Sequence, residues 1–503
     1  MGLYRTFISL LLFSTMCLSF IYLMQVNDME LNARQVDYGN GSRSTKNSES
    51  LADHEGKYFD GPRELHTQSH WARVPFTTLT DSLHAFGVYL DDRYRPNYFL
   101  RILILQRGNN PTERLACKAD GEAFNTWAER YEMCENHGKT YTGWIYSCLV
   151  TYNTKPDLKS VILNVYSQNG SLINSQQFAV TSLSPDSSTS TDISNLHRNI
   201  RNLSFKTNSN LGVLRSNQTL PILGSQNQKT PPKPKNKVTF KTDQRPGVSI
   251  GVCVPPLHSN LYIQNLIDFL EFCWILGANK VFLYIHDLPT DFIHTLSFYL
   301  KDKTHLFEIL HWDLPANIRQ KSYQVIWNNG QILAVQHCLY QNMANFDWLL
   351  FLDIDEMLIP KSVYNWQDLL PTVLKGSDDN VAALSFESAF FSWDFDSQVS
   401  SPIKYLRHLH RTKRTTVLHS KLLIQAKNVF EVGIHHLSRA VTDSMRVIRV
   451  PAEVALLHHY RACIQSDTEW IQCDLVIQDT SALKYETQLS ASRDHINRLS
   501  QFT

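Results

Sequence analysis

An acidic cluster that follows an apolar segment is the feature of this chain that points most directly to chemistry. Residues 348–360 read WLLFLDIDEMLIP, and the apolar part is continuous rather than alternating, as in a buried strand of a parallel sheet. Asp353 and Asp355 are two residues apart, so on an extended chain their side chains leave the same face and can bind one hard divalent cation. Ligands of open α/β sheets bind beyond the carboxyl ends of the strands, where such a cation would hold a diphosphate. The pattern therefore favours a nucleotide-sugar transferase.

Two other interpretations of the acidic cluster are open. Acidic residues at the end of a strand are often solvated turn residues, and phosphatases with an Asp nucleophile also carry D-x-D after a strand. In those phosphatases the motif follows the first strand of the domain and has Thr or Val at the next-but-one position. Here it follows about a hundred residues of α/β pattern and continues with Glu356 and Met357.

Apolar strands and amphipathic helices alternate before the acidic cluster. The predicted strands are 248–254, 280–287 and 305–312, and the predicted helices are 262–277, 291–300 and 329–343. Alternation of this kind predicts a doubly wound, mostly parallel sheet with right-handed crossovers. We assign it to a domain at 246–503, whose later part is β-rich and carries much of the histidine.

The residues before this domain divide into five further parts. We expect a cytosolic tail at 1–5, a transmembrane helix at 6–24, a flexible stem at 25–78, a small β-rich accessory domain at 79–180 and a polar linker or disordered insertion at 181–245. The nineteen uncharged residues at 6–24 are long enough to cross a bilayer core of roughly 30 Å. A cleaved signal peptide is the alternative, but no A-x-A-like site follows Met24, which favours an uncleaved signal anchor.

A signal anchor with Arg5 before it and acidic residues after it would place the rest of the chain in the lumen. Sequons for N-glycosylation agree with that location, at Asn40, Asn169, Asn202 and Asn217. Eight cysteines after Cys17 could form disulfides there, but their pairing cannot be read from sequence. The 48 Lys and Arg residues against 47 Asp and Glu residues leave no overall basic character, so nucleic acid is not an expected partner.

Several of these segments resemble glycosyltransferase family 92. The most specific are LLFLDIDE at 349–356 and HHYR at 458–461, and the similarity runs discontinuously from about residue 80 to residue 465. The resemblance implies a type II membrane protein of the Golgi with a GT-A fold. It also implies inverting transfer of galactose from UDP-galactose to a glycan or glycoprotein acceptor, with Mn²⁺ or another divalent cation.

Candidate ligands for the cation and the diphosphate follow from the chemistry of this reaction, in which a cation neutralises charge on the leaving diphosphate. We expect Asp355 to bind the metal, and Asp353 to bind the metal, a metal-bound water or a ribose hydroxyl. His435 or His436 could add an imidazole ligand, although a solvated turn is the alternative for that pair. Binding of the donor is predicted for Asp353 and for three basic side chains, Lys421, His459 and Arg461.

Inverting transfer also requires a base that accepts the proton of the acceptor hydroxyl. Glu387 and Asp394 are the candidates, because both follow the acidic cluster on a segment expected to border the acceptor. Either could instead be an ordinary surface acid. Two functions from other classes remain open, a lectin-like or scaffold protein that kept the fold without turnover, and a metal-dependent phosphohydrolase.

Overall fold

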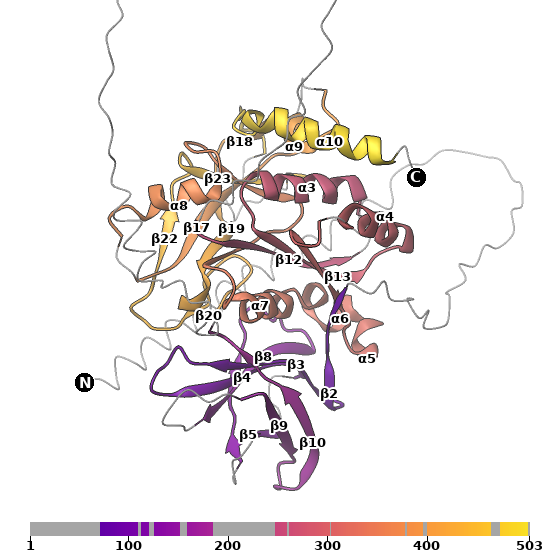
Figure 1. Cartoon of the computed structure of the whole chain (residues 1–503), viewed down its shortest axis with the longest axis vertical. Coiled ribbons are helices and arrows are strands. Elements are labelled where there is room, and N and C mark those ends of the chain that lie inside the picture. The colour runs from indigo at the N-terminus through magenta and orange to yellow at the C-terminus, as the bar shows by residue number, and fades with distance from the viewer. Residues whose placement is uncertain are drawn as a thin grey trace, which may run out of the picture.

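The computed structural model of this chain (Figure 1) describes residues 71–108, 112–119, 125–150, 158–184, 247–258, 261–301, 303–377, 380–395, 400–463 and 473–500. The predicted cytosolic tail, the predicted membrane span and nearly all of the predicted stem lie outside these ranges, as do residues 185–246. Within the described ranges, no helix is long and apolar enough to span a bilayer.

A mixed sheet of ten strands is the centre of the fold. One half consists of parallel strands in the order β1–β14–β13–β12–β15. These strands are β1 (Ala72–Val74), β12 (Ile250–His258), β13 (Lys280–Asp287), β14 (Phe307–Trp312) and β15 (Trp348–Phe351). The helices that alternate with them are α3 (Ile263–Ile275), α4 (Thr290–Leu300) and α7 (Gln331–Asn342). The alternation of strands and helices predicted from the sequence is thus present in the structure.

The other half of the sheet is mixed, with both parallel and antiparallel strands. After β15 the order is β19–β17–β23–β16, with β22 beside β17, and β19 and β16 run antiparallel to their neighbours. These strands are β16 (Glu356–Pro360), β17 (Val381–Phe390), β19 (Thr416–Gln425), β22 (Arg446–Val450) and β23 (Ala455–His459). The short connection 352–355 therefore leads from β15, in the middle of the sheet, to β16 at its far edge. The acidic cluster lies on this connection.

Shorter elements complete this part of the chain. The helices are α5 (Ala316–Arg319), α6 (Ser322–Val325), α8 (Trp366–Leu374), α9 (Lys404–Arg407) and α10 (Glu486–Ser500), with 3-10 turns at Trp327–Gly330, Ala426–Asn428 and Leu483–Tyr485. The strands are β18 (His410–Thr412), β20 (Val429–Glu431), β21 (Arg439–Ala440) and β24 (Val476–Gln478). Helices α3, α4, α8 and α10 contribute to the core on one side of the sheet, and α7 covers the other side.

Strands are the only regular elements in the described part of residues 77–182. A six-stranded sheet, β11–β3–β4–β8–β7 with β2 beside β3, faces a four-stranded sheet, β10–β9–β5–β6, across an apolar core. The strands are β2 (Thr77–Thr80), β3 (Leu83–Asp91), β4 (Tyr98–Arg107), β5 (Arg114–Ala119), β6 (Thr126–Trp127), β7 (Glu129–Glu132), β8 (Tyr141–Val150), β9 (Ser160–Tyr166), β10 (Leu172–Ala179) and β11 (Thr181–Ser182). We call these residues the β-rich part. Because β1 and the start of β2 precede residue 79, regular structure begins inside the range predicted to be stem.

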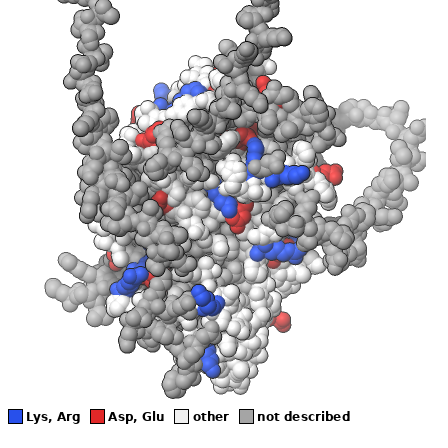
Figure 2. Space-filling model, viewed as in Figure 1, with Lys and Arg blue, Asp and Glu red and all other residues white. Residues whose placement is uncertain are grey.

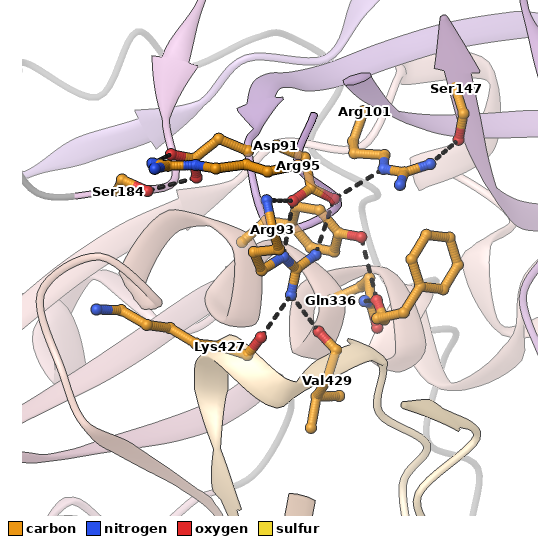
Figure 3. A network of polar contacts seen from close by, with 12 residues as sticks. Asp91, Arg93, Arg95, Arg101, Ser147, Ser184, Gln336, Lys427 and Val429 are labelled. Atoms are coloured by element: carbon orange, nitrogen blue, oxygen red, sulfur yellow. Dashed lines mark hydrogen bonds and ion pairs between the residues drawn. The ribbon is translucent and has the colours of Figure 1, made fainter. Parts of the chain in front are cut away.

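The β-rich part packs directly on the α/β part. Phe86, Leu103 and Ile145 share one apolar cluster with Leu333 and Leu339 of α7. A buried polar network lies beside this cluster (Figure 3), in which Arg93 pairs with Asp91 and donates hydrogen bonds to the carbonyl groups of Lys427 at 3.4 Å and Val429 at 2.6 Å. Burial opposes ionisation of Asp91, but Arg93 and Arg101 outweigh it and lower the pKa of this carboxyl. The two parts therefore share one continuous interior.

Three disulfides are present among the described residues, Cys117–Cys148, Cys253–Cys338 and Cys463–Cys473. The first joins two sheets of the β-rich part, and the second joins β12 to α7 beneath the central sheet. Cys273 is buried in the core and unpaired. The sequence allowed these pairings and could not choose among them, because cysteines 85 residues apart meet only through the fold.

Candidate active site

The connection between β15 and β16 is a tight turn that presents two carboxylates. The amide of Glu356 donates to the carbonyl of Asp353 at 3.0 Å, and the amide of Asp353 donates to the Glu356 carboxylate, also at 3.0 Å. The Tyr460 amide binds the carbonyl of Asp355 at 2.7 Å, which fixes the turn to the end of β23. The side chains of Asp353 and Asp355 are 31% and 38% exposed, whereas Glu356 is fully buried. The two aspartates can therefore meet a ligand, and Glu356 supports the turn from inside.

Lys421 is a buried cation directly beneath the acidic turn. Its Nζ lies 2.8 Å from Asp353 Oδ2 and 3.2 Å from Glu356 Oε2. Burial alone would lower the pKa of Lys421, but the two carboxylates outweigh it and raise that pKa, so the ammonium stays charged. Burial raises the pKa of Glu356 despite the neighbouring Lys421. One ammonium thus pairs with two carboxylates, that of the partly exposed Asp353 and that of the buried Glu356.

A second group of basic side chains surrounds Asp355. His459 Nε2 lies 3.4 Å from Asp355 Oδ2, and Lys404 donates to the carbonyl of Ile354 at 2.9 Å. Burial opposes ionisation of Asp355, but His459, Lys404 and Arg461 outweigh it and lower the pKa of this carboxyl. Burial lowers the pKa of His459 below that of a free imidazole, so the ring is neutral at pH 7. Asp355 is therefore ionised next to a neutral imidazole, the form in which histidine binds metals.

His435 lies close to this group on the segment after β20. Its Nδ1 is 3.1 Å from the Ser420 carbonyl, and the Ser420 hydroxyl donates to the His435 carbonyl at 2.7 Å. The rings of His435 and His419 are 5.6 Å apart, and those of His419 and His459 are 6.2 Å apart. Burial lowers the pKa of His435 well below its usual value. Three imidazoles thus come together from segments that are separate in the sequence.

His436 contacts a different part of the molecule. Its Nδ1 is 3.4 Å from Glu135 of the β-rich part, and its Nε2 is 3.3 Å from the Ser438 hydroxyl. Of the two adjacent histidines proposed from the sequence, His435 is therefore the one placed with His419 and His459.

The two candidate bases lie on or just after β17. Glu387 is partly buried and accepts a hydrogen bond from Thr415. Asp394 is exposed and accepts a hydrogen bond from Ser392 at 2.9 Å, and the same Ser392 hydroxyl binds the Cys463 amide at 3.2 Å. Asp394 is therefore attached to the segment that carries Arg461.

Two residues that the sequence did not indicate also reach the acidic turn. Gln331, the first residue of α7, donates to Asp353 Oδ1 at 3.4 Å. It follows a strained turn in which Asn328, Asn329 and Gly330 have φ angles of 40°, 55° and 81°. Lys404 of α9 is the other, and burial lowers its pKa to about 8 although Asp355 and Asp268 oppose that shift. Neither follows a recognisable motif; the run of Asn and Gly before Gln331 was the available signal for a turn there.

The arrangement fits a divalent cation that is bound together with a diphosphate. Within the described ranges, no three His, Cys, Asp or Glu side chains form a metal site by themselves. Asp353 is already paired with Lys421, whereas Asp355 is partly exposed and has His459 Nε2 beside it; His459 Nδ1 faces the buried Glu356 at 3.8 Å. Divalent cations at phosphate sites typically take one or two carboxylates from the protein and complete their coordination with phosphate oxygens and water. Asp355 with His459 or His435 could supply such a partial set of ligands.

Comparisons with known proteins identify the family of this chain. A curated relative, the beta-1,4-galactosyltransferase galt-1 of Caenorhabditis elegans, is 24% identical over 215 residues, which are 42% of this chain and 48% of the relative. The chain thus matches about half the length of that protein. Among solved structures, an active-site mutant of LgtC matches with 12% identity and a TM-score of 0.22, covering 48% of this chain and 95% of that one, a likeness that supports no conclusion about the fold. The model of glycosyltransferase family 92 matches residues 248–500, about half of the chain, so this protein belongs to glycosyltransferase family 92.

Proposed function

We propose that this protein is a metal-dependent galactosyltransferase with a GT-A-like α/β domain, which transfers galactose from UDP-galactose to a glycan with inversion. The observation that supports this most is the acidic turn at the end of β15, where two accessible aspartates are surrounded by Lys421, His459 and Arg461. We propose UDP-galactose as the donor because the chain belongs to glycosyltransferase family 92 and because the matched relative is named a beta-1,4-galactosyltransferase.

The proposed roles of the side chains follow from their charge and burial. A divalent cation, when bound, would neutralise charge that develops on the leaving diphosphate. Asp355 would bind that cation with a neutral imidazole, and Asp353 would bind the ribose or a metal-bound water. Lys421 keeps Asp353 oriented, and Arg461 would contact a phosphate through its planar guanidinium. Lys404 adds a further positive charge near Asp355.

The donor and the stereochemistry can be tested together. We expect the full-length protein with Mn²⁺ to transfer galactose from UDP-galactose to a glycan array, and proton NMR of the product to show the large anomeric coupling of a β-galactoside. An α-type coupling, or transfer only from another UDP-sugar, would contradict the proposal. Hydrolysis of the donor without any dependence on an acceptor would indicate a phosphohydrolase, and glycan binding without turnover would indicate a lectin-like protein.

Asp394 is the proposed base, because it is exposed and its segment is attached beside Arg461. Replacing it with Asn should lower kcat by about 10²- to 10⁴-fold with little change in the KM for the donor, since only proton transfer is lost. Glu387→Gln is the matched comparison and should lower kcat less than about tenfold. The opposite order of the two variants in steady-state kinetics would assign the base to Glu387.

We also propose that the protein is a single-pass type II membrane protein of the Golgi with its catalytic domain in the lumen. The predicted anchor at 6–24 lies outside the described residues, so the proposal rests on its sequence, on the family and on features of the folded part. Three disulfides are typical of an oxidising compartment. The sequon at Asn169 lies in an exposed turn between β9 and β10, where a glycan can be attached. On the described part of the face in Figure 2, acidic and basic residues are interspersed.

A further inference from the structure

Two buried carboxylates connect the β-rich part to the candidate active site. One belongs to the β-rich part and binds the α/β part, and the other belongs to the α/β part and binds the β-rich part. Glu135, just after β7, accepts a hydrogen bond from the Ile434 amide at 2.7 Å and lies 3.4 Å from His436. Glu431, at the end of β20, accepts from the Cys134 amide at 2.8 Å and from the Tyr131 hydroxyl at 2.6 Å. We call this reciprocal pair, Glu135 and Glu431, the carboxylate clasp.

The loop that carries Glu135 has a backbone conformation that is unfavourable for side chains other than glycine. Glu135 and His137 have φ angles of 61° and 51°, in the left-handed region. Strained residues of this kind persist only where the surrounding contacts require them. Glu135 is 3% exposed, and the amide of Ile434 would have no acceptor if its carboxylate were removed. The fold therefore keeps the contact between Glu135 and the Ile434 amide although the backbone of the Glu135 loop is in an unfavourable conformation.

The clasp acts on the segment that contains His435. Ile434, whose amide binds Glu135, directly precedes His435, and Glu431 begins the same segment. His435 in turn exchanges two hydrogen bonds with Ser420, the neighbour of Lys421 on β19. A shift of this segment would therefore change both the imidazole of His435 and the strand that positions Lys421 against Asp353.

The same loop also contacts the turn that precedes α7. The ring of His137 stacks on Trp327 with centroids 3.9 Å apart, and the ammonium of Lys139 lies 5.7 Å from the Trp327 ring. Trp327 belongs to the strained turn before Gln331, which donates to Asp353. The loop that carries Glu135 thus contacts both the segment that contains His435 and the turn that precedes Gln331.

We propose that the carboxylate clasp makes the β-rich part a component of the catalytic unit, with Glu135 as a positioning residue for His435 and the bound cation. The proposal rests on the proposed function as far as the cation is concerned. Glu135 contacts His436 and the Ile434 amide rather than Asp355, so it acts through the segment 434–436.

The test compares variants of the full-length protein in two measurements that need no acceptor. Glu135→Ala should increase amide hydrogen exchange at 433–436 by about tenfold or more, since a buried hydrogen bond is lost. It should also weaken the binding of Mn²⁺ by about 10- to 100-fold in a calorimetric titration, as expected when a group that orients a metal ligand is removed. Glu135→Gln keeps an acceptor oxygen for the Ile434 amide and should recover most of the affinity. Glu129→Ala, an exposed glutamate on β7, should change neither quantity.

Unchanged exchange at 433–436 and unchanged Mn²⁺ affinity in Glu135→Ala would overturn the proposal. Should that variant not fold, Tyr131→Phe decides, because it removes only the hydroxyl that donates to Glu431. We expect it to increase exchange at 431–436 by about threefold; no increase would overturn the clasp. Absence of Mn²⁺ binding by the wild-type protein would instead refute the proposed cation, and the exchange measurement would still decide whether the clasp positions the segment.

Discussion

Replacing Asp355 with Asn should lower the rate of transfer and the affinity for Mn²⁺ by about a hundredfold or more, since a side chain that binds the metal directly loses its charge. The shape of the side chain is retained, so the fold around the turn should persist. His459, Lys404 and Arg461 lower the pKa of Asp355 against the opposing effect of burial, so this carboxylate is ionised throughout the neutral range. The loss should therefore be equally large at pH 6 and pH 8. Initial rates over a range of Mn²⁺ concentrations, with calorimetry of Mn²⁺ binding, measure it.

The control for this variant is Asp443→Asn, which removes an aspartate from an exposed turn between β21 and β22. It should leave both the rate and the affinity unchanged. Glu356→Gln should have a smaller effect on Mn²⁺ affinity than Asp355→Asn, because Glu356 is buried and supports the turn rather than facing the ligand. Equal activity of Asp355→Asn and wild type at limiting Mn²⁺ would refute the assignment of Asp355.

Replacing Lys421 with Met should lower the free energy of unfolding, by up to about 3–5 kcal/mol at pH 9, because the buried carboxylate of Glu356 loses its counter-charge. Lys421 Nζ is 2.8 Å from Asp353 and 3.2 Å from Glu356, and Glu356 is fully buried. Activity should fall with stability, since Asp353 loses the partner that orients it. Urea denaturation followed by tryptophan fluorescence measures the loss, and Lys413→Met, at an exposed position after β18, is the control.

The loss of stability in Lys421→Met should depend on pH in a defined direction. Burial raises the pKa of Glu356 in the folded protein above its value in the unfolded chain, so the folded state binds more protons and the free energy of unfolding decreases as pH rises between the two values. Without Lys421 the pKa of Glu356 rises further. Wild type releases this proton near pH 8 and the variant only at higher pH, so the variant should lose more stability at pH 9 than at pH 5. Adding Glu356→Gln to Lys421→Met should restore part of the loss. An equal loss at both pH values would show that Glu356 is not the group left unpaired.

Local sequence patterns were sufficient to predict the parallel half of the sheet. Continuous apolar strands and helices with one apolar face recur at 248–343, and the structure has β12, α3, β13, α4, β14 and α7 there. The predicted helix at 329–343 begins two residues later, at Gln331, because Asn328, Asn329 and Gly330 have positive φ angles and form a turn. Patterns of this kind are visible in sequence because each element must place its own apolar side chains in the core.

The membership in glycosyltransferase family 92 and the position of Asp353 and Asp355 at the end of β15 were also accessible from the sequence. The roles of these residues in binding a metal and a donor remain predictions, as do those of His435, His459 and Arg461. What the sequence determined is thus the α/β framework, the family and the acidic turn itself. Each of these is recorded in a short, contiguous run of residues.

Only the tertiary structure decided which side chains surround that turn. Lys421 meets Asp353 across 68 residues of sequence, and Glu135 meets Ile434 across 299, because the mixed half of the sheet and the packing of the β-rich part bring those segments together. Periodicity reports whether a residue is buried, but it does not report which distant strand lies beside it. The partners of buried charges depend on that order of strands, since an ion pair forms only where two chains approach within about 4 Å. The acidic turn was therefore predictable, and its electrostatic environment was not.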